Sequence, residues 1–207
     1  MPDHYYTQAP QSAHKPGRIA YEYRGVGLQF ETDSGVFSRT EIDPGSDLLL
    51  HALPEEMEGS VLDMGCGYGV IGVAVGRVHP RCLVLMADVN ERACLLAKTN
   101  AGQNGVGAQV VQSDGYAAIG PDRFAYILQN PPIRAGKTVI YEMFAQAARR
   151  LHPGGSLWLV IRRQQGAESA VRYLETLFTR VEVPLKKGGY WILLASEPKI
   201  IQGDETL

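Results

Sequence analysis

Short apolar runs and amphipathic stretches alternate along most of this 207-residue chain. From residue 60 onward, apolar runs typical of buried strands fall at 60–64, 82–88, 109–113, 124–129 and 155–161. Stretches with apolar residues three and four positions apart, typical of helices, fall at 69–78, 90–103, 138–151 and 167–178. This alternation predicts an α/β fold in which a parallel sheet carries helices on both faces.

The two ends of the chain depart from this rhythm. Residues 19–24 and 28–31 are short strand-like runs around two glycines, which predicts a hairpin. Near the C-terminus, 180–185 and 190–195 are joined only by 186–189, a link too short for a crossover, so these strands are predicted to be antiparallel. A doubly wound, mostly parallel sheet that closes with an antiparallel hairpin is the class I methyltransferase (Rossmann-like) fold.

The same patterns predict the domain organisation. We expect a loosely ordered N-terminus, a hairpin followed by a Gly-Val-Phe-Ser loop, one methyltransferase-like domain and a polar tail, at 1–18, 19–42, 43–197 and 198–207. Asp43 followed by Pro44 predicts a helix start, because Asp caps a free N–H and Pro suits the first turn. We interpret Asp43 and the apolar run 48–53 as parts of the fold.

Composition excludes several classes of protein. No apolar run approaches the roughly 18 residues of a membrane span, and the polar N-terminus lacks the apolar stretch of a secretory signal. The 3 cysteines form no Cys-x-x-Cys pair, and the 5 scattered histidines lack metal-ligand spacing. We therefore predict a cytoplasmic protein without a membrane segment, a disulfide framework or a metal site.

The net charge of −2 is unevenly distributed. Residues 1–133 carry 9 Lys/Arg against 15 Asp/Glu, a difference of −6, whereas 134–187 carry 10 against 4, a difference of +6. The remaining residues 188–207 carry 1 against 3. A basic segment of this kind suits a phosphate backbone. Each arginine taken alone also fits a solvated helix face.

A glycine-rich loop, Gly65-Cys66-Gly67-Tyr68-Gly69, follows the predicted strand 60–64. Glycines let the backbone turn tightly and approach a ligand, and the next helix offers free N–H groups. Asp88-Val89 ends the second strand, where a carboxylate can accept from ribose hydroxyls. Asp114-Gly115 ends the third, where it can accept from an adenine amine. Asp63 either holds the loop or faces a cofactor ammonium group.

The identity of the cofactor has two interpretations. Residues 67–72 match Gly-x-Gly-x-x-Gly, which leaves a nicotinamide or flavin site open. The preceding pattern Asp63-x-Gly65-x-Gly67-x-Gly69, together with the acidic residue on the third strand, favours S-adenosylmethionine. We interpret Cys66 as a small buried residue rather than a nucleophile.

The turn Asn130-Pro131-Pro132-Ile133 follows the strand 124–129 and is the predicted catalytic element. The amino group of a nucleobase is a poor nucleophile because its lone pair is delocalised into the ring. The Asn130 side-chain oxygen and the Pro131 carbonyl can accept both of its hydrogens, which favours a pyramidal nitrogen placed for in-line displacement. Asn130 also borders the predicted cofactor. A plain Asn-Pro turn ending a strand is the alternative interpretation.

A stacking partner for a planar substrate is not evident within this turn. Enzymes that methylate adenine or glutamine commonly carry an aromatic residue where this chain has Ile133, and isoleucine offers only apolar contact. Phe37 is our candidate for stacking, although a core phenylalanine fits the pattern as well.

These motifs resemble the small-subunit (16S) ribosomal RNA guanine-N2 methyltransferases in a short, single-domain form. The resemblance covers about residues 19–196 and rests on 30–38, 43–50, 63–69, 130–137 and 160–167. It implies S-adenosylmethionine as methyl donor, and ribosomal RNA or the small-subunit particle as partner. We expect no counterpart here of the extra N-terminal domain that two-domain members carry. The family also often has Asp where this chain has Ala125.

By this resemblance the acceptor is the exocyclic N2 amine of a guanine, and we predict RNA contacts at Arg134, Lys137, Arg162 and Arg163. Three alternatives stay open: an N-methyltransferase acting on adenine N6 or a glutamine side chain, a nicotinamide oxidoreductase, and a non-catalytic RNA-binding module. The sequence does not predict the oligomeric state.

Overall fold

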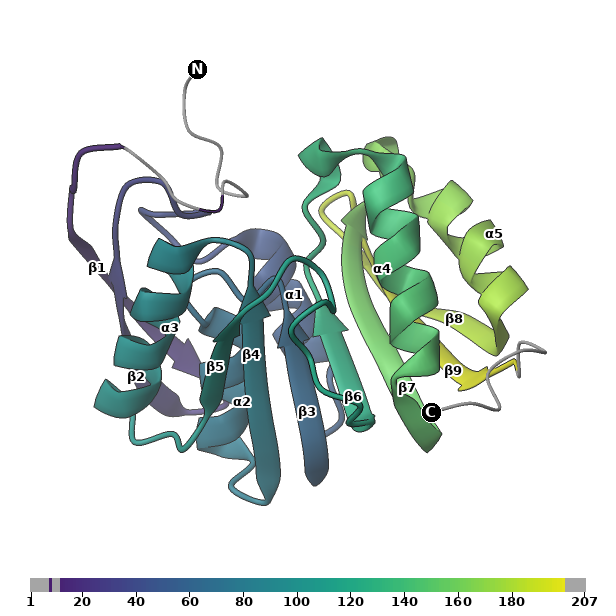
Figure 1. Ribbon diagram of the computed structural model, residues 1–207, viewed down its shortest axis with the longest axis horizontal. Coiled ribbons are helices and arrows are strands. Elements are labelled where there is room, and N and C mark those ends of the chain that lie inside the picture. Colours follow the sequence, from purple (N-terminus) through teal and green to yellow (C-terminus); the bar gives the residue numbers. More distant parts are fainter. Residues whose placement is uncertain (1–7, 9–11, 200–207) are drawn as a thin grey trace.

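Figure 1 shows the computed structural model, which describes residue 8 and residues 12–199. A seven-stranded sheet forms its centre, and a two-stranded sheet lies beside it. The strands of the large sheet, in spatial order, are β5 (Gln109–Gln112), β4 (Cys82–Asp88), β3 (Gly59–Met64), β6 (Phe124–Gln129), β7 (Leu151–Arg162), β9 (Tyr190–Pro198) and β8 (Phe178–Lys187). Strands β5 to β7 are parallel, and β9 is antiparallel to both β7 and β8. The predicted methyltransferase fold is confirmed.

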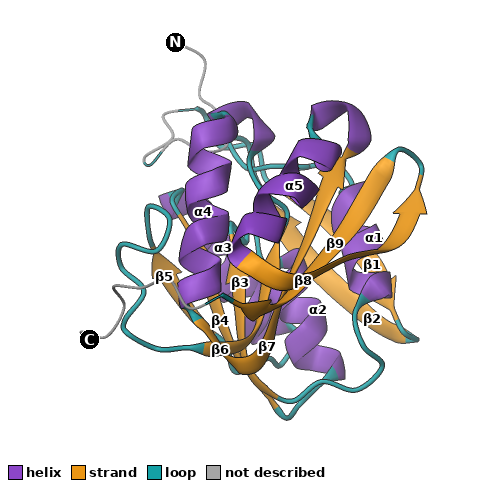
Figure 2. Ribbon diagram, turned by 90° about the vertical axis from the view of Figure 1, so that its right-hand side faces the viewer, coloured by secondary structure: helices purple, strands orange, loops and turns teal. Residues whose placement is uncertain are grey.

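Helices cover both faces of this sheet (Figure 2). They are α1 (Pro44–Ala52), α2 (Val70–Val78), α3 (Glu91–Gln103), α4 (Lys137–Arg149) and α5 (Ala167–Leu177), with single 3₁₀ turns η1 (Ile133–Ala135) and η2 (Arg163–Gln165). The predicted helix over 138–151 ends earlier because Leu151 already belongs to β7. The segment 113–123 between β5 and β6 forms turns and no helix.

Alternate residues of each strand enter two separate cores, because successive side chains of a strand point to opposite faces. Val61 packs in the core beneath α1, α2 and α3, whereas its neighbour Leu62 packs beneath α4 and α5. Both side chains are fully buried. The central strands are therefore apolar on both faces, which explains their continuous hydrophobic runs in the sequence.

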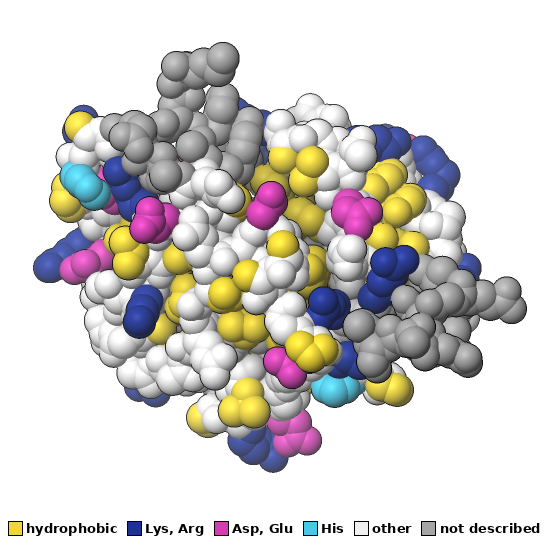
Figure 3. Space-filling model, viewed as in Figure 1, with side chains coloured by type: hydrophobic (Ala, Val, Ile, Leu, Met, Phe, Trp, Pro, Cys, Tyr) yellow, Lys and Arg dark blue, Asp and Glu magenta, His cyan; other side chains and the backbone are white. Residues whose placement is uncertain are grey.

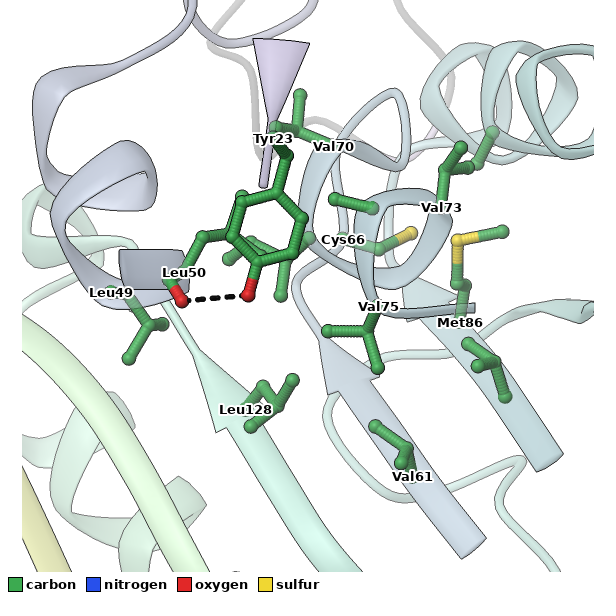
Figure 4. Packing of buried hydrophobic residues seen from close by; sticks show 14 of the residues in the cluster. Tyr23, Leu49, Leu50, Val61, Cys66, Val70, Val73, Val75, Met86 and Leu128 are labelled. Atoms are coloured by element: carbon green, nitrogen blue, oxygen red, sulfur yellow. Dashed lines mark hydrogen bonds between the residues drawn. The ribbon is translucent and has the colours of Figure 1, made fainter. Parts of the chain in front are cut away.

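The predicted N-terminal hairpin is formed by β1 (Gly17–Tyr23) and β2 (Val26–Thr32). Strand β1 docks on α1 through the fully buried Tyr23, whose hydroxyl donates to the Leu50 carbonyl at 2.9 Å (Figure 4). Strand β2 contacts α3, where Asn100 bonds the main chain of Glu31. The C-terminal hairpin turns through Gly188 and Gly189, both at positive φ, as a two-residue turn requires.

The two predicted terminal segments are only partly described. Loose order was predicted for residues 1–18, and of these 1–7 and 9–11 lie outside the described part. The described stretch differs from it, because the His14 ring and the Lys15 main-chain N–H both bond the Asp33 carboxylate and β1 begins at Gly17. In the predicted tail, β9 continues to Pro198, and residues 200–207 lie outside the described part.

Candidate active site

A cleft of about 1180 Å³ opens at the carboxyl ends of the parallel strands. Its walls come from the loops after β3, β4, β5 and β6, from the start of α1 and from one side of α4. Figure 3 shows hydrophobic side chains gathered in the middle of the surface seen in Figure 1, between the part that carries α3 and the part that carries α4. Ligands of open α/β sheets bind at the carboxyl ends of the strands.

The glycine loop brings bare backbone to the cleft. Gly65, Gly67 and Gly69 have φ values of +74°, +55° and +93°, which L side chains rarely adopt. A Cβ built on Gly65 or Gly67 would meet nothing within 4 Å, so both face open space and line the cleft. Gly69 does not line it, and a Cβ there would lie 3.2 Å from Ala97 and from Met86 Sδ.

Two loop residues between these glycines also line the cleft. Burial raises the pKa of the Cys66 thiol, which keeps it protonated and fits a packing residue. Tyr68 is buried, and its hydroxyl donates to the Ser38 carbonyl at 3.1 Å. The loop is thereby tied to the segment that follows the N-terminal hairpin.

Asp88 places a carboxylate at the end of β4, against the loop. Its oxygens accept from the main-chain N–H of Gly67 and of Asn90, at 2.8 and 2.9 Å. Burial raises its pKa, and these hydrogen bonds oppose the rise. Asp88 and Val89 line the cleft, as a residue that bonds ribose hydroxyls must.

Asp114 and Gly115 line the cleft next to Asp88, at the end of β5. The Asp114 side chain is exposed, whereas the neighbouring Ser113 hydroxyl bonds the Gly115 carbonyl at 2.7 Å. Two carboxylates at the ends of adjacent strands, beside bare glycine backbone, fit an adenosine-containing cofactor.

Asp63 is placed differently from these residues. It is 1% exposed and does not line the cleft. One of its oxygens accepts from the Gly72 N–H at 2.8 Å, and the other has no partner within the described residues. Burial raises its pKa to about 7, and the bond from Gly72 opposes the rise. Of its two predicted roles, this geometry matches holding the loop on the start of α2.

Asn130 stands directly after β6 with its side-chain nitrogen bonded to the start of α1. That nitrogen donates to Asp43 Oδ2 and Ser46 Oγ of α1, both at 2.9 Å. A carboxylate only accepts, so the amide nitrogen must face it. Neither the Asn130 side-chain oxygen nor the Pro131 carbonyl accepts a hydrogen bond from residue 8 or residues 12–199. Both residues line the cleft with these acceptors available.

The other two residues of the predicted catalytic turn lie in different places. Pro132 lines the cleft, and its carbonyl accepts from Ala135 N at 2.8 Å to begin η1. Ile133 does not line the cleft and packs against the core beneath α4 and α5. Ile133 thus supports the turn from behind.

The predicted substrate-binding residues lie in two places. Phe37 is 39% exposed and lines the cleft. The four predicted RNA contacts are exposed and lie outside the lining. Among them, Lys137 lies 5.0 Å over the Tyr141 ring, Arg162 lies 4.5 Å over the Tyr190 ring, Arg163 pairs with Glu168 at 3.5 Å, and Arg134 is in η1.

The sequence interpretation missed several lining residues. Asp43 and Ser46 line the cleft although we had assigned Asp43 to the fold alone. A helix-cap pattern carries no signal for a partner 87 residues away. The α4 side of the lining, which includes Thr138, Glu142 and Gln146, was also not predicted, because its positions look like an ordinary solvated helix face.

Within the described part of the chain, no helix is long and apolar enough to cross a membrane. Those same residues contain no group of three or more His, Cys, Asp or Glu placed to hold a metal ion.

The sheet order, the closing hairpin and the glycine-loop cleft define a methyltransferase with a Rossmann-like fold. The family model described as "Methyltransferase small domain" matches residues 27–194. The chain belongs to this family.

Several known proteins are similar to this chain. "Uncharacterized protein YbxB" of Bacillus subtilis (strain 168) is 43% identical over 200 residues, covering 95% of this chain and 100% of that protein. "Ribosomal RNA small subunit methyltransferase C" of Pasteurella multocida is 36% identical over 145 residues, covering 68% of this chain and 44% of that protein. The chain therefore spans less than half the length of that second relative.

A solved structure with the same fold is the T. thermophilus 16S rRNA N2 G1207 methyltransferase (RsmC) in complex with AdoMet and guanosine. It superposes with a TM-score of 0.81 at 29% identity, covering 91% of this chain and 52% of that one.

Proposed function

We propose that this protein is an S-adenosylmethionine-dependent N-methyltransferase that modifies the exocyclic N2 amine of a guanine in small-subunit ribosomal RNA. The family membership supports the reaction class. The T. thermophilus relative, whose structure contains AdoMet and guanosine, supports the choice of donor and base.

The cofactor-binding part of the cleft is assigned from the geometry. Gly65 and Gly67 would approach the cofactor with bare backbone, Asp88 would accept from the ribose and Asp114 from the adenine amine. Cys66, Tyr68, Val89 and Gly115 would shape the walls. When bound, S-adenosylmethionine supplies an electrophilic methyl group.

The observation that carries the proposal is a pair of acceptors at the end of β6 that accept no hydrogen bond from the described residues. The Asn130 side-chain oxygen and the Pro131 carbonyl would each accept one hydrogen of the amine. This draws the nitrogen lone pair out of conjugation with the ring and holds the nitrogen in line with the methyl group. No strong general base is needed, because the methylated ammonium loses its proton readily.

The base and the RNA strand are assigned to neighbouring surfaces. Phe37 lines the cleft with part of its ring exposed, so we propose that it stacks on the guanine. Arg134, Lys137, Arg162 and Arg163 would contact phosphates outside the cleft, since they are exposed and basic.

Asn130→Ala tests the catalytic assignment. Removing one preorganised hydrogen-bonding group should lower kcat by about 10²–10³-fold. Calorimetry should show an unchanged affinity for S-adenosylmethionine. Asn104→Ala is the matched control, because Asn104 does not line the cleft and bonds Gln29 of β2. Wild-type turnover in Asn130→Ala would refute the assignment.

Nucleoside mass spectrometry identifies the base. The substrates are ribosomal RNA and small-subunit particles from cells that lack this protein. The purified protein should methylate at least one of the two, and digestion of the product should yield N2-methylguanosine. Formation of N6-methyladenosine, or methylation of protein instead of RNA, would replace the guanine assignment. Binding without any transfer would support the non-catalytic alternative.

A further inference from the structure

We propose that Asp43 and Ser46, at the start of α1, are positioning residues that fix the direction of the Asn130 amide for methyl transfer. This inference rests on the proposed function of Asn130. It assigns a catalytic task to a segment that the sequence marks only as a helix start.

The hydrogen bonds of the Asn130 side chain all involve its amide nitrogen, and within the described residues its amide oxygen accepts none. Asp43 Oδ2 and Ser46 Oγ each lie 2.9 Å from Asn130 Nδ2, so both amide hydrogens have a partner. Asp43 and Ser46 also line the cleft, so the contact lies at the edge of the substrate space. Nothing else among the described residues bonds this side chain.

The direction of the amide decides whether the site can work. An amino group offers two donors and therefore needs acceptors opposite it. If the Asn130 amide rotated by half a turn, its NH₂ would meet the substrate NH₂, donor against donor. Its oxygen would then face the Asp43 carboxylate, acceptor against acceptor. A carboxylate at position 43 opposes this rotation, whereas a hydroxyl there, which both donates and accepts, would tolerate either orientation.

The Asp43 carboxylate is itself held in place. It caps α1 by accepting from Ser46 N at 2.9 Å, with the same oxygen that bonds Asn130. A Cβ built on Gly45 would lie 2.8 Å from this oxygen and 3.0 Å from the Tyr190 ring. Tyr190 of β9 and the glycine therefore bring the closing hairpin against the cap, with no room for a side chain between them.

Capping alone does not explain this arrangement. Helix capping needs one acceptor for Ser46 N, and serine caps about as well as aspartate. Asp43→Ser consequently preserves the cap, and it removes the preference for one amide direction because a hydroxyl can either donate to or accept from the Asn130 amide. This separates a positioning role from a structural one.

The experiment measures kcat, KM and cofactor affinity for Asp43→Ser, with guanosine-containing RNA as substrate. We expect kcat to fall about ten-fold or more, with the melting temperature and the S-adenosylmethionine affinity unchanged. Ser46→Ala should give a smaller fall of a few-fold, because the carboxylate remains. Asp47→Asn is the matched control: it removes an acid from the same turn, but Asp47 bonds the Tyr21 hydroxyl rather than Asn130.

The same substitution at position 43 should have the opposite effect on kcat when residue 130 is aspartate. In Asn130→Asp, both side-chain oxygens are acceptors, so no orientation needs to be imposed, and the new carboxylate is repelled by Asp43. Adding Asp43→Ser to Asn130→Asp should therefore raise kcat, because the serine hydroxyl can donate to the new carboxylate. If Asp43→Ser lowers kcat by the same factor in both backgrounds, or has no effect in the wild-type background, the positioning role is refuted.

A readout without turnover separates this inference from the proposed function. In ¹⁵N spectra, the side-chain NH₂ of Asn130 should exchange slowly with water in the wild type and faster in Asp43→Ser. Fast exchange in the wild type would refute the positioning role of Asp43 and Ser46 even if methylation occurs. A slow signal in a protein that methylates no guanine would leave the orientation intact and refute the proposed function.

Discussion

Asp63 shows how the fold sets the chemistry of one residue. Its carboxyl group is buried under the glycine loop, and within the described residues it accepts one hydrogen bond, from Gly72 N. Burial raises its pKa from 3.8 to about 7. The folded state therefore binds a proton more tightly than the unfolded state does. This residue makes stability fall as the pH rises from about 4 through about 7.

We predict that Asp63→Asn flattens the pH dependence of unfolding. The free energy of unfolding of the wild type, relative to the variant, should decrease by on the order of 3 kcal/mol between pH 4 and pH 8. Denaturant titrations across that range measure this. Some slope should persist, because burial also raises the pKa of Asp88. A wild type that gains stability over this range relative to Asp63→Asn would contradict the prediction.

Two glycines of the same loop are predicted to respond differently to alanine. Both have positive φ, so each substitution carries strain of about 1 kcal/mol. The Gly65→Ala methyl would project into open cleft and should mainly weaken cofactor binding. The Gly69→Ala methyl would crowd Ala97 and Met86 at 3.2 Å and should mainly lower the melting temperature. Calorimetry and thermal unfolding of both variants decide this, and equal effects on both quantities would contradict it.

The N-terminal hairpin is attached to the glycine loop through α3. Asn100 is fully buried in this contact. Its oxygen accepts from Glu31 N of β2 at 2.7 Å, and its nitrogen donates to the carbonyls of Glu31 and Tyr68 at 3.0 and 2.8 Å. One amide therefore joins three elements that are distant in sequence, and it satisfies backbone groups at the edge of β2.

We predict that Asn100→Ala destabilises the protein by about 2–3 kcal/mol, because buried backbone groups lose their partners. It should also weaken cofactor binding, since the Tyr68 carbonyl belongs to the glycine loop. Urea unfolding and calorimetry measure the two effects. Asn104→Ala, at the end of the same helix and half-exposed, is the control and should cost much less. Equal losses for the two variants would count against this role of Asn100.

Charge is divided across the protein as a whole. The acidic part, 1–133, includes the glycine-loop side of the cleft, and the basic part, 134–187, begins beside the Asn-Pro turn. Figure 3 shows Lys and Arg side chains at its upper right edge, over the region of α4 and α5. An RNA strand with its target base in the cleft would meet this basic part next.

We predict that Arg162→Gln/Arg163→Gln weakens RNA binding and flattens its dependence on salt. Each lost phosphate contact should lower the slope of log K against log salt by about 0.7 for single-stranded RNA. Arg18→Gln/Arg81→Gln is the control, because these exposed arginines pair with Glu31 and Glu58 in the other half of the chain. An unchanged slope in the first variant would return Arg162 and Arg163 to solvated surface.

Much of the fold was predictable from local pattern. The strands β3, β4 and β6 lie within about one residue of their predicted positions, because a strand buried on both faces is a continuous apolar run. The start of α1 at Pro44 and the C-terminal hairpin follow from caps and turns, which act over a few residues. The end of α4 was misplaced, because an apolar residue at 151 fits a helix and a strand equally well.

The local sequence sufficed for the order of the elements, the glycine loop and the Asn-Pro turn, since each depends on propensities within a few neighbouring residues. Only the three-dimensional arrangement placed Asp43 and Ser46 against Asn130, set Asp63 beneath the loop and Ile133 behind the turn. Those relations depend on strand order and on which face each helix covers. Contacts between residues so far apart are made by packing, and no pattern in the intervening sequence records them.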